Sequence, residues 1–197
     1  MGETESRVQE TLDHLFRRQS GRIVAHLPRF FGPDHIDLAE AVVQEALLKA
    51  VQTWPLQGIP DNPESWILRA AKNSAIDHIR KTREHGLTEA ALDSLASDDP
   101  DEARFESELQ DDQLKLFFIC CHPALPREAR IALTLKTICG FGVEEIARAF
   151  LAKPETIAQR IVRAKQKIAE LGLAYEAPPP DELEARLASV MEVLYLL

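Results

Sequence analysis

Cysteines are few in this chain, and long apolar runs are missing, which excludes two classes of protein. Three cysteines, Cys120, Cys121 and Cys139, cannot form the framework of a disulfide-rich secreted domain. No apolar run is long enough to span a bilayer, and the acidic, polar N-terminus does not resemble a signal sequence. We therefore expect a cytoplasmic protein that has no membrane partner.

Residue clusters that could carry chemistry are also scarce. Cys120, Cys121 and His122 lack the second CxxC or HxxxH pair that a tetrahedral metal site needs, so we interpret them as a packed helix end. The chain has no glycine loop that would cradle a phosphate and no convincing nucleophile with a base. We expect no enzymatic activity, no bound metal and no cofactor.

The composition is that of a folded helical protein of 197 residues, with 45% hydrophobic residues. Long amphipathic runs rich in Ala, Leu, Glu and Arg predict an all-α fold. The net charge of −9 is unevenly distributed, because residues 84–112 hold one basic and eleven acidic residues whereas residues 113–172 hold ten basic and five acidic ones. We expect two helical domains, 1–85 and 113–173, joined by an acidic linker, 86–112.

Residues 143–168 show the pattern of two short amphipathic helices around a tight turn. Apolar residues recur at helical spacing from Val143 to Phe150, so one stripe of the first helix must be buried. Residues 151–153 then break the pattern. Pro154 suits the first position of a second helix, where its missing N–H costs nothing. The pattern predicts a helix-turn-helix.

The second helix of this pair separates a buried face from a solvated one. Ile157, Ile161, Ala164 and Ile168 fall on the same side. The opposite side carries side chains able to bind base edges or phosphates in a DNA major groove, namely Glu155, Thr156, Gln159, Arg160, Arg163 and Lys167. An ordinary helical hairpin with a charged outer face is the alternative, but the cationic face after so short a turn favours DNA binding.

The first domain contains two further predicted helices. Residues 37–54 form a helical pattern with Asp37 as the expected N-cap and Pro55 as its end. A second helix is expected over residues 63–83, with the preceding asparagine as N-cap, a proline at its first position and a basic last turn. Trp66 lies on the apolar stripe of that helix, so we interpret it as a core residue rather than a stacking platform.

Residues 174–197 form a separate C-terminal segment. Three consecutive prolines, 178–180, make a stiff spacer, and Asp181 is the expected cap of another amphipathic helix. That helix ends in apolar residues without a polar exit. We expect it either to belong to a larger domain or to dock on another surface.

Three segments, in this order, resemble the extracytoplasmic-function (ECF) group of bacterial RNA polymerase sigma factors. DLAEAVVQEALLKAV at 37–51 is similar to the helix that docks on the polymerase clamp. NPESWILRAAKNSAIDHIRK at 62–81 is similar to the promoter-melting helix. PREARIALTLKTICGFGVEEIARAFLAKPETIAQRIVRAKQKI at 126–168 is similar to the helix-turn-helix for the upstream promoter element. FFICCHPALPREAR and the proline-spaced helix resemble a subgroup with a tetratricopeptide-like extension, of which residues 174–197 would be the start.

The resemblance implies a non-catalytic initiation subunit that binds core RNA polymerase and promoter DNA. In the −35 element, base edges would be read by Glu155, Thr156, Gln159 and Arg160, and phosphates bound by Arg163 and Lys167. The −10 element would be melted and captured by Arg69, Lys72, Asn73, Arg80 and Lys81. The polymerase clamp would be contacted by Asp37, Glu40, Gln44 and Glu45. The acidic linker would mimic nucleic-acid charge, and a C-terminal extension or an anti-sigma protein would regulate activity.

Two other interpretations stay open at this point. A helix-turn-helix regulator would bind duplex DNA without polymerase, and it would not need the basic helix at 63–83. A helical scaffold that binds only proteins would not need the cationic face of the helix that starts at Pro154.

Overall fold

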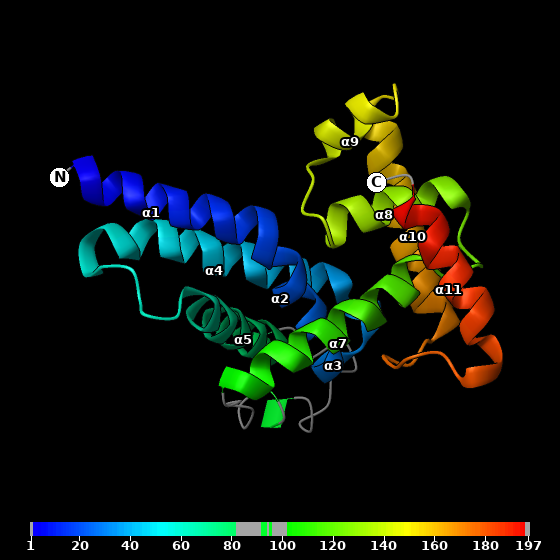
Figure 1. Cartoon of the computed structure of the whole chain (residues 1–197), viewed down its shortest axis with the longest axis horizontal. Coiled ribbons are helices and arrows are strands. Elements are labelled where there is room, and N and C mark those ends of the chain that lie inside the picture. Colours follow the sequence, from blue (N-terminus) through cyan, green and yellow to red (C-terminus); the bar gives the residue numbers. More distant parts are fainter. Residues whose placement is uncertain (1, 82–91, 94, 96–101, 196–197) are drawn as a thin grey trace.

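The computed structural model describes residues 2–81, 92–93, 95 and 102–195, and every regular element in this part of the chain is helical, which confirms the all-α prediction. None of the helices described is long and apolar enough to cross a membrane. The elements are α1 (Gly2–His14), the π-helix η1 (Leu15–Gln19), α2 (Ser20–His26), α3 (Pro28–Phe31), the 3-10 helix η2 (Pro33–His35), α4 (Ile36–Gln57), α5 (Pro63–Lys81), α7 (Glu102–Cys120), α8 (Arg127–Thr137), α9 (Val143–Ala149), α10 (Pro154–Leu171) and α11 (Pro180–Leu194) (Figure 1).

The elements α1 to α5 form an N-terminal lobe in which α4 and α5 pack against each other. The predicted cap of α5 is confirmed, because the Ser65 backbone N–H donates to Asn62 Oδ1 at 3.0 Å. Trp54 of α4 is buried and meets Trp66 of α5 edge to face, with 5.4 Å between the ring centroids. Trp66 therefore packs in the core, as predicted.

The predicted bounds of α4 were wrong at both ends. The helix begins at Ile36, and Asp37 lies inside its first turn rather than at the cap. Pro55 lies inside the last turn, since proline there loses only one intrahelical hydrogen bond. The helix ends at Gln57 and is capped by Gly58, whose φ of 88° is favoured by glycine and whose N–H bonds to the Trp54 carbonyl oxygen at 2.9 Å.

Helix α7 crosses the predicted boundary between the linker and the second domain. Residues 86–91, 94 and 96–101 of the predicted linker lie outside the described residues, but residues 102–112 belong to one continuous helix that runs on to Cys120. It packs along α2 and buries Leu109 completely. The predicted boundary at residue 112 therefore falls inside a helix, which apolar positions of α7 stabilise by packing against the N-terminal lobe.

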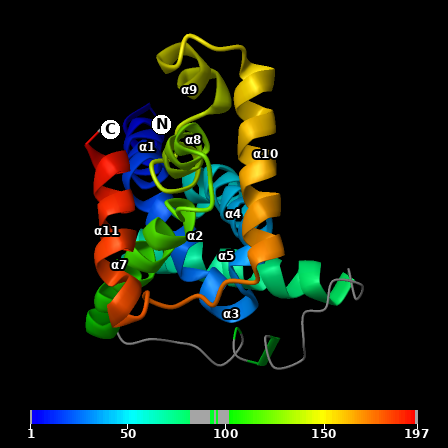
Figure 2. The ribbon, with the colours of Figure 1, turned by 90° about the vertical axis from the view of Figure 1, so that its right-hand side faces the viewer.

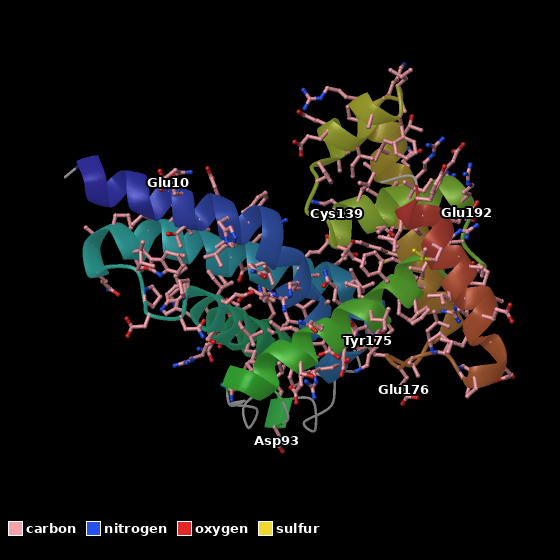
Figure 3. The ribbon with its side chains drawn as sticks, viewed as in Figure 1. Glu10, Asp93, Cys139, Tyr175, Glu176 and Glu192 are labelled. Atoms are coloured by element: carbon pink, nitrogen blue, oxygen red, sulfur yellow. The ribbon has the colours of Figure 1, made fainter. Side chains whose placement is uncertain are left out.

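A C-terminal lobe contains α8, α9 and α10, with α11 along α7 and α8. Helix α11 begins at Pro180, and Asp181 lies in its first turn without a side-chain cap bond, so that predicted cap was wrong. Val190 and Val193 are buried against the lobe. Glu192 binds the guanidinium of Arg127 at 2.7 Å, near the place where α11 crosses α8 (Figure 3).

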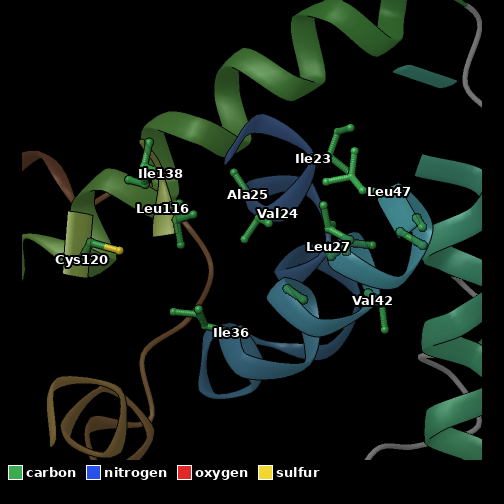
Figure 4. Packing of buried hydrophobic residues seen from close by; sticks show 14 of the residues in the cluster. Ile23, Val24, Ala25, Leu27, Ile36, Val42, Leu47, Leu116, Cys120 and Ile138 are labelled. Atoms are coloured by element: carbon green, nitrogen blue, oxygen red, sulfur yellow. The ribbon is translucent and has the colours of Figure 1, made fainter. Parts of the chain in front are cut away.

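The two lobes share one continuous core. Ile23, Val24 and Leu27 of α2 belong to the same buried cluster as Leu116 of α7 and Ile138 at the end of α8 (Figure 4). In Figure 2, α10 runs upright beside α8, with α4 next to it. The orientation of α10 relative to the N-terminal lobe is therefore set by direct packing in this structure.

Candidate nucleic-acid interface

The predicted helix-turn-helix is present as α9 and α10. The N–H of Gly142 donates to Glu145 Oε2 at 2.8 Å and fixes the start of α9. Leu151 in the turn adopts a left-handed φ of 50°, and the Ala152 N–H bonds back to the Ala147 oxygen at 2.9 Å. Pro154 is the first residue of α10, as predicted. These contacts determine how α10 leaves α9.

The two faces of α10 lie as the sequence predicts. Ile157, Ile161, Ala164 and Ile168 are all buried. The outer face consists of exposed side chains, namely Glu155, Thr156, Gln159, Arg163 and Lys167. The helix therefore presents a row of hydrogen-bonding and cationic groups to solvent, which is what insertion into a major groove requires.

Arg160 is the member of this face that is partly withdrawn from solvent. Its guanidinium lies 2.7 Å from the carboxylate of Glu128 in the first turn of α8. Together with Arg163 and Lys167 it borders a surface hollow of about 220 Å³ beside Pro126. The ion pair is solvent-accessible, so Arg160 can exchange it for a base or a phosphate at low cost.

The candidate −10 surface on α5 is only partly as predicted. Arg69, Asn73, Arg80 and Lys81 are exposed. Lys72 is a correction, because it is only 6% exposed and its ammonium lies 4.9 Å from the centre of the Phe30 ring. Its long stem packs in the N-terminal lobe and its charge rests on an aromatic face. Lys72 is therefore unavailable to DNA in this conformation.

The four candidate polymerase contacts on α4 differ in their surroundings. Gln44 is exposed. Glu45 accepts a hydrogen bond from His78 of α5 at 2.9 Å, which lowers the pKa of that carboxyl. Asp37 and Glu40 instead bind Lys165 of α10, a residue that the sequence analysis did not select as a contact. The acidic edge of α4 is therefore partly covered by the C-terminal lobe.

A buried polar network behind this edge was also missed. Asp112 of α7 receives hydrogen bonds from His26 at 2.9 Å and from Lys115 at 2.8 Å. Burial alone would raise the pKa of the Asp112 carboxyl, but these two donors outweigh it and lower the pKa. The His26–Asp112 contact links positions 86 residues apart, so no local pattern could have revealed it.

The cysteines and His122 form no chemical centre. Cys120 and Cys121 are buried, and burial raises the pKa of both thiols, which keeps them protonated. No group of three or more metal-binding side chains occurs among the described residues. The burial of Cys120 and Cys121 agrees with the interpretation of a packed helix end, whereas His122 is only half-buried.

Known families match both lobes. Residues 15–85 match the family described as Sigma-70 region 2, and residues 118–168 match Sigma-70, region 4. The chain is 38% identical over 169 residues to an uncharacterized protein of Rhizobium meliloti (strain 1021), covering 83% of this chain and 40% of that protein. It is 28% identical over 162 residues to the ECF RNA polymerase sigma factor SigE of Mycolicibacterium smegmatis, covering 79% of this chain and 59% of that protein.

The two matched regions span more than half of the chain and lie in separate lobes. The chain therefore belongs to the sigma-70 family, in its ECF group, as the resemblance implied. It spans about two fifths and three fifths of the lengths of the two relatives. The finer assignment to a subgroup with a tetratricopeptide-like extension stays a prediction.

Proposed function

We propose that the protein is a promoter-specificity subunit that binds core RNA polymerase, recognises a −35 element and melts the −10 element. The observation that carries the proposal is the exposed polar face of α10, held by a helix-turn-helix in the lobe that matches sigma region 4. The lobe that matches sigma region 2 supplies a second basic surface on α5. The protein performs no catalysis in this role.

In the −35 element, the first turns of α10 contact base edges. Glu155, Thr156, Gln159 and Arg160 are nearest the N-terminus of the helix, which is the end that reaches deepest into the groove in helix-turn-helix docking. Arg163 and Lys167, one and two turns further along, bind phosphates and set the register. The exposure of all these residues except the partly exposed Arg160 supports a contact between this face and DNA, and their order along α10 supports the division of roles.

In the −10 element, α5 binds the melted strand. Arg69, Asn73, Arg80 and Lys81 are exposed on this helix and offer cationic and amide groups to single-stranded DNA. Trp54, near the end of α4, and Trp66, near the start of α5, pack edge to face on the two sides of the intervening loop. Lys72 takes no part in this role, because its ammonium lies over Phe30.

Core polymerase is contacted through the acidic edge of α4, which consists of Asp37, Glu40, Gln44 and Glu45. Carboxylate and amide groups along one helix edge provide steering and register toward a basic surface. Gln44→Lys, which places a positive charge at an exposed position of the edge, should weaken core binding. The regulator, either a C-terminal extension or an anti-sigma protein, stays a prediction.

Reconstitution with bacterial core polymerase tests the proposal. Genomic promoter fragments are transcribed by core enzyme with and without the protein, and the 5′ ends of the transcripts are mapped. We expect discrete starts that depend on the protein and share a −35 sequence. Duplex binding without transcripts would favour the regulator, and binding neither to duplex DNA nor to core polymerase would favour the scaffold.

A further inference from the structure

Lys165 of α10 lies between two acidic residues of α4. Its ammonium is 2.5 Å from Asp37 Oδ1 and 2.9 Å from Glu40 Oε2. The side chain of Lys165 is 10% exposed and that of Glu40 14% exposed, whereas Asp37 is largely in solvent. Burial alone would lower the pKa of the lysine, but the two carboxylates outweigh it and raise the pKa. The lysine is therefore charged in this position.

Glu40 is held by a second contact from the C-terminal lobe. Its Oε1 accepts a hydrogen bond from the hydroxyl of Thr137, at the end of α8, at 2.6 Å. Both oxygens of this carboxylate are thus bound by residues more than ninety positions away in the chain. Because both oxygens are occupied, Glu40 is not available to another protein while the contact lasts.

A close backbone contact joins the lobes independently of these charges. Gly21 of α2 faces the end of α8 so closely that an added Cβ would lie 1.9 Å from the carbonyl oxygen of Ile138 and 2.7 Å from its carbonyl carbon. Both atoms belong to the backbone, so neither can rotate aside. Only glycine allows this approach.

The segment after α10 provides a third connection. The hydroxyl of Tyr175 donates toward the carbonyl oxygens of Ala25 in α2 and Asp112 in α7, the latter at 2.8 Å (Figure 3). Burial raises the pKa of this phenol, which therefore stays a neutral donor. The chain that leaves the recognition helix is thereby bound to the N-terminal lobe.

We propose that these contacts form a closed, autoinhibited state, in which Lys165 and Thr137 occupy the acidic edge of α4 and core polymerase can dock only after the lobes separate. This inference rests on the proposed function, since it assigns the regulation of the same surface. The outer face of α10 stays exposed in the closed state, so the block acts on polymerase docking rather than on duplex recognition. The affinity for core polymerase is then reduced in proportion to the fraction of open molecules.

Lys165→Met in the full chain tests the electrostatic contact. Methionine keeps the apolar stem and removes the charge. In the closed state Glu40 therefore loses its cationic partner. We expect the radius of gyration in small-angle X-ray scattering to increase and the affinity for core polymerase to rise roughly five- to tenfold. Lys153→Met, at an exposed position just before α10, removes the same charge and should change neither quantity.

Gly21→Ala tests the same state through sterics alone. Alanine suits the interior of α2 better than glycine does, so the helix is strengthened while the lobes are forced apart. We expect the same expansion and the same gain in core affinity, with helix content by circular dichroism maintained. Gly142→Ala is the matched control, since its added Cβ would meet a side-chain oxygen of Glu145 in the same lobe at 3.3 Å and no backbone atom of the other lobe.

The direction of the change separates autoinhibition from simple damage. A variant that merely misfolds loses affinity for core polymerase, whereas an opened variant gains it. If both variants bind core polymerase no more tightly than the wild type, the autoinhibition is refuted, and promoter-specific transcription would still stand. If both variants expand but neither they nor the wild type bind core polymerase, the proposed function fails together with this regulation.

Discussion

The two candidate DNA surfaces, on α10 and on α5, are built differently although both are basic helices. The outer face of α10 is open, with one buried stripe opposite it, and only Arg160 has a partner on another helix there among the candidate residues. On α5 the buried arc is wider, because Leu68 and Lys72 are buried beside the stripe that contains Ile67. A basic residue in the sequence of α5 is therefore not automatically a surface residue.

The reason for the difference is how the buried residues are placed around each helix. The buried residues of α10 lie on one stripe, so the opposite face of that helix meets solvent. Helix α5 packs on α4, and its Lys72 also reaches Phe30 of α3. The pattern of apolar residues in a helix indicates its main packing face. The long aliphatic stem of a lysine can pack against a second neighbour that this pattern does not indicate.

The largest effect is expected for Arg160→Ala on the open surface of α10. In the holoenzyme, loss of a contact to a base edge should weaken binding to a cognate −35 duplex by about 1–3 kcal/mol and relax the sequence preference. Lys167→Ala should weaken binding to all duplexes alike. Fluorescence anisotropy against cognate and scrambled duplexes measures both, and equal losses for the two variants on both DNAs would contradict the division of roles.

The next effect concerns the buried lysine of α5. Lys72→Met removes a desolvated cation–π contact, so we expect the free energy of unfolding to fall by about 1 kcal/mol. The salt dependence of strand capture should stay the same. Arg69→Met, one turn earlier and exposed, should leave stability nearly unchanged and reduce the slope of log affinity against log salt by about 0.7. A reduced slope of log affinity against log salt for Lys72→Met would mean that Lys72 contacts DNA.

Asn62→Ala should also lower the free energy of unfolding by about 1 kcal/mol. We expect this loss to be slightly smaller than the loss for Lys72→Met. The substitution removes the side-chain acceptor of the Ser65 N–H at the start of α5. Urea denaturation measures it, with Asp61→Ala as control at the preceding exposed position. An equal loss in both variants would mean that the cap contributes nothing specific.

Features within one helix could be predicted from the sequence, and contacts between lobes could not. The faces of α10, the cap of α5 and the start at Pro154 follow from residues at most a few turns apart. Lys165 meets Asp37 across 128 positions, and its spacing on α10 gives no sign of that partner. The sequence rules also misplaced both ends of α4. The helix begins before Asp37, and Gly58 rather than Pro55 determines where the chain turns after it.

The smallest effect is expected at the junction between α4 and α5. Glu45 and His78 are both roughly half exposed, so His78→Ala should cost only a few tenths of a kcal/mol. The pKa of Glu45 is lowered in the folded protein, so the stabilisation is present above the ordinary glutamate range and is lost as the pH falls through the lowered value. Urea titrations of wild type and Glu45→Gln across acidic pH should therefore converge. If the two stabilities do not converge at acidic pH, Glu45 is bound more tightly by its partners than its exposure indicates. It would then resemble the paired Glu40 rather than a residue that polymerase can reach directly.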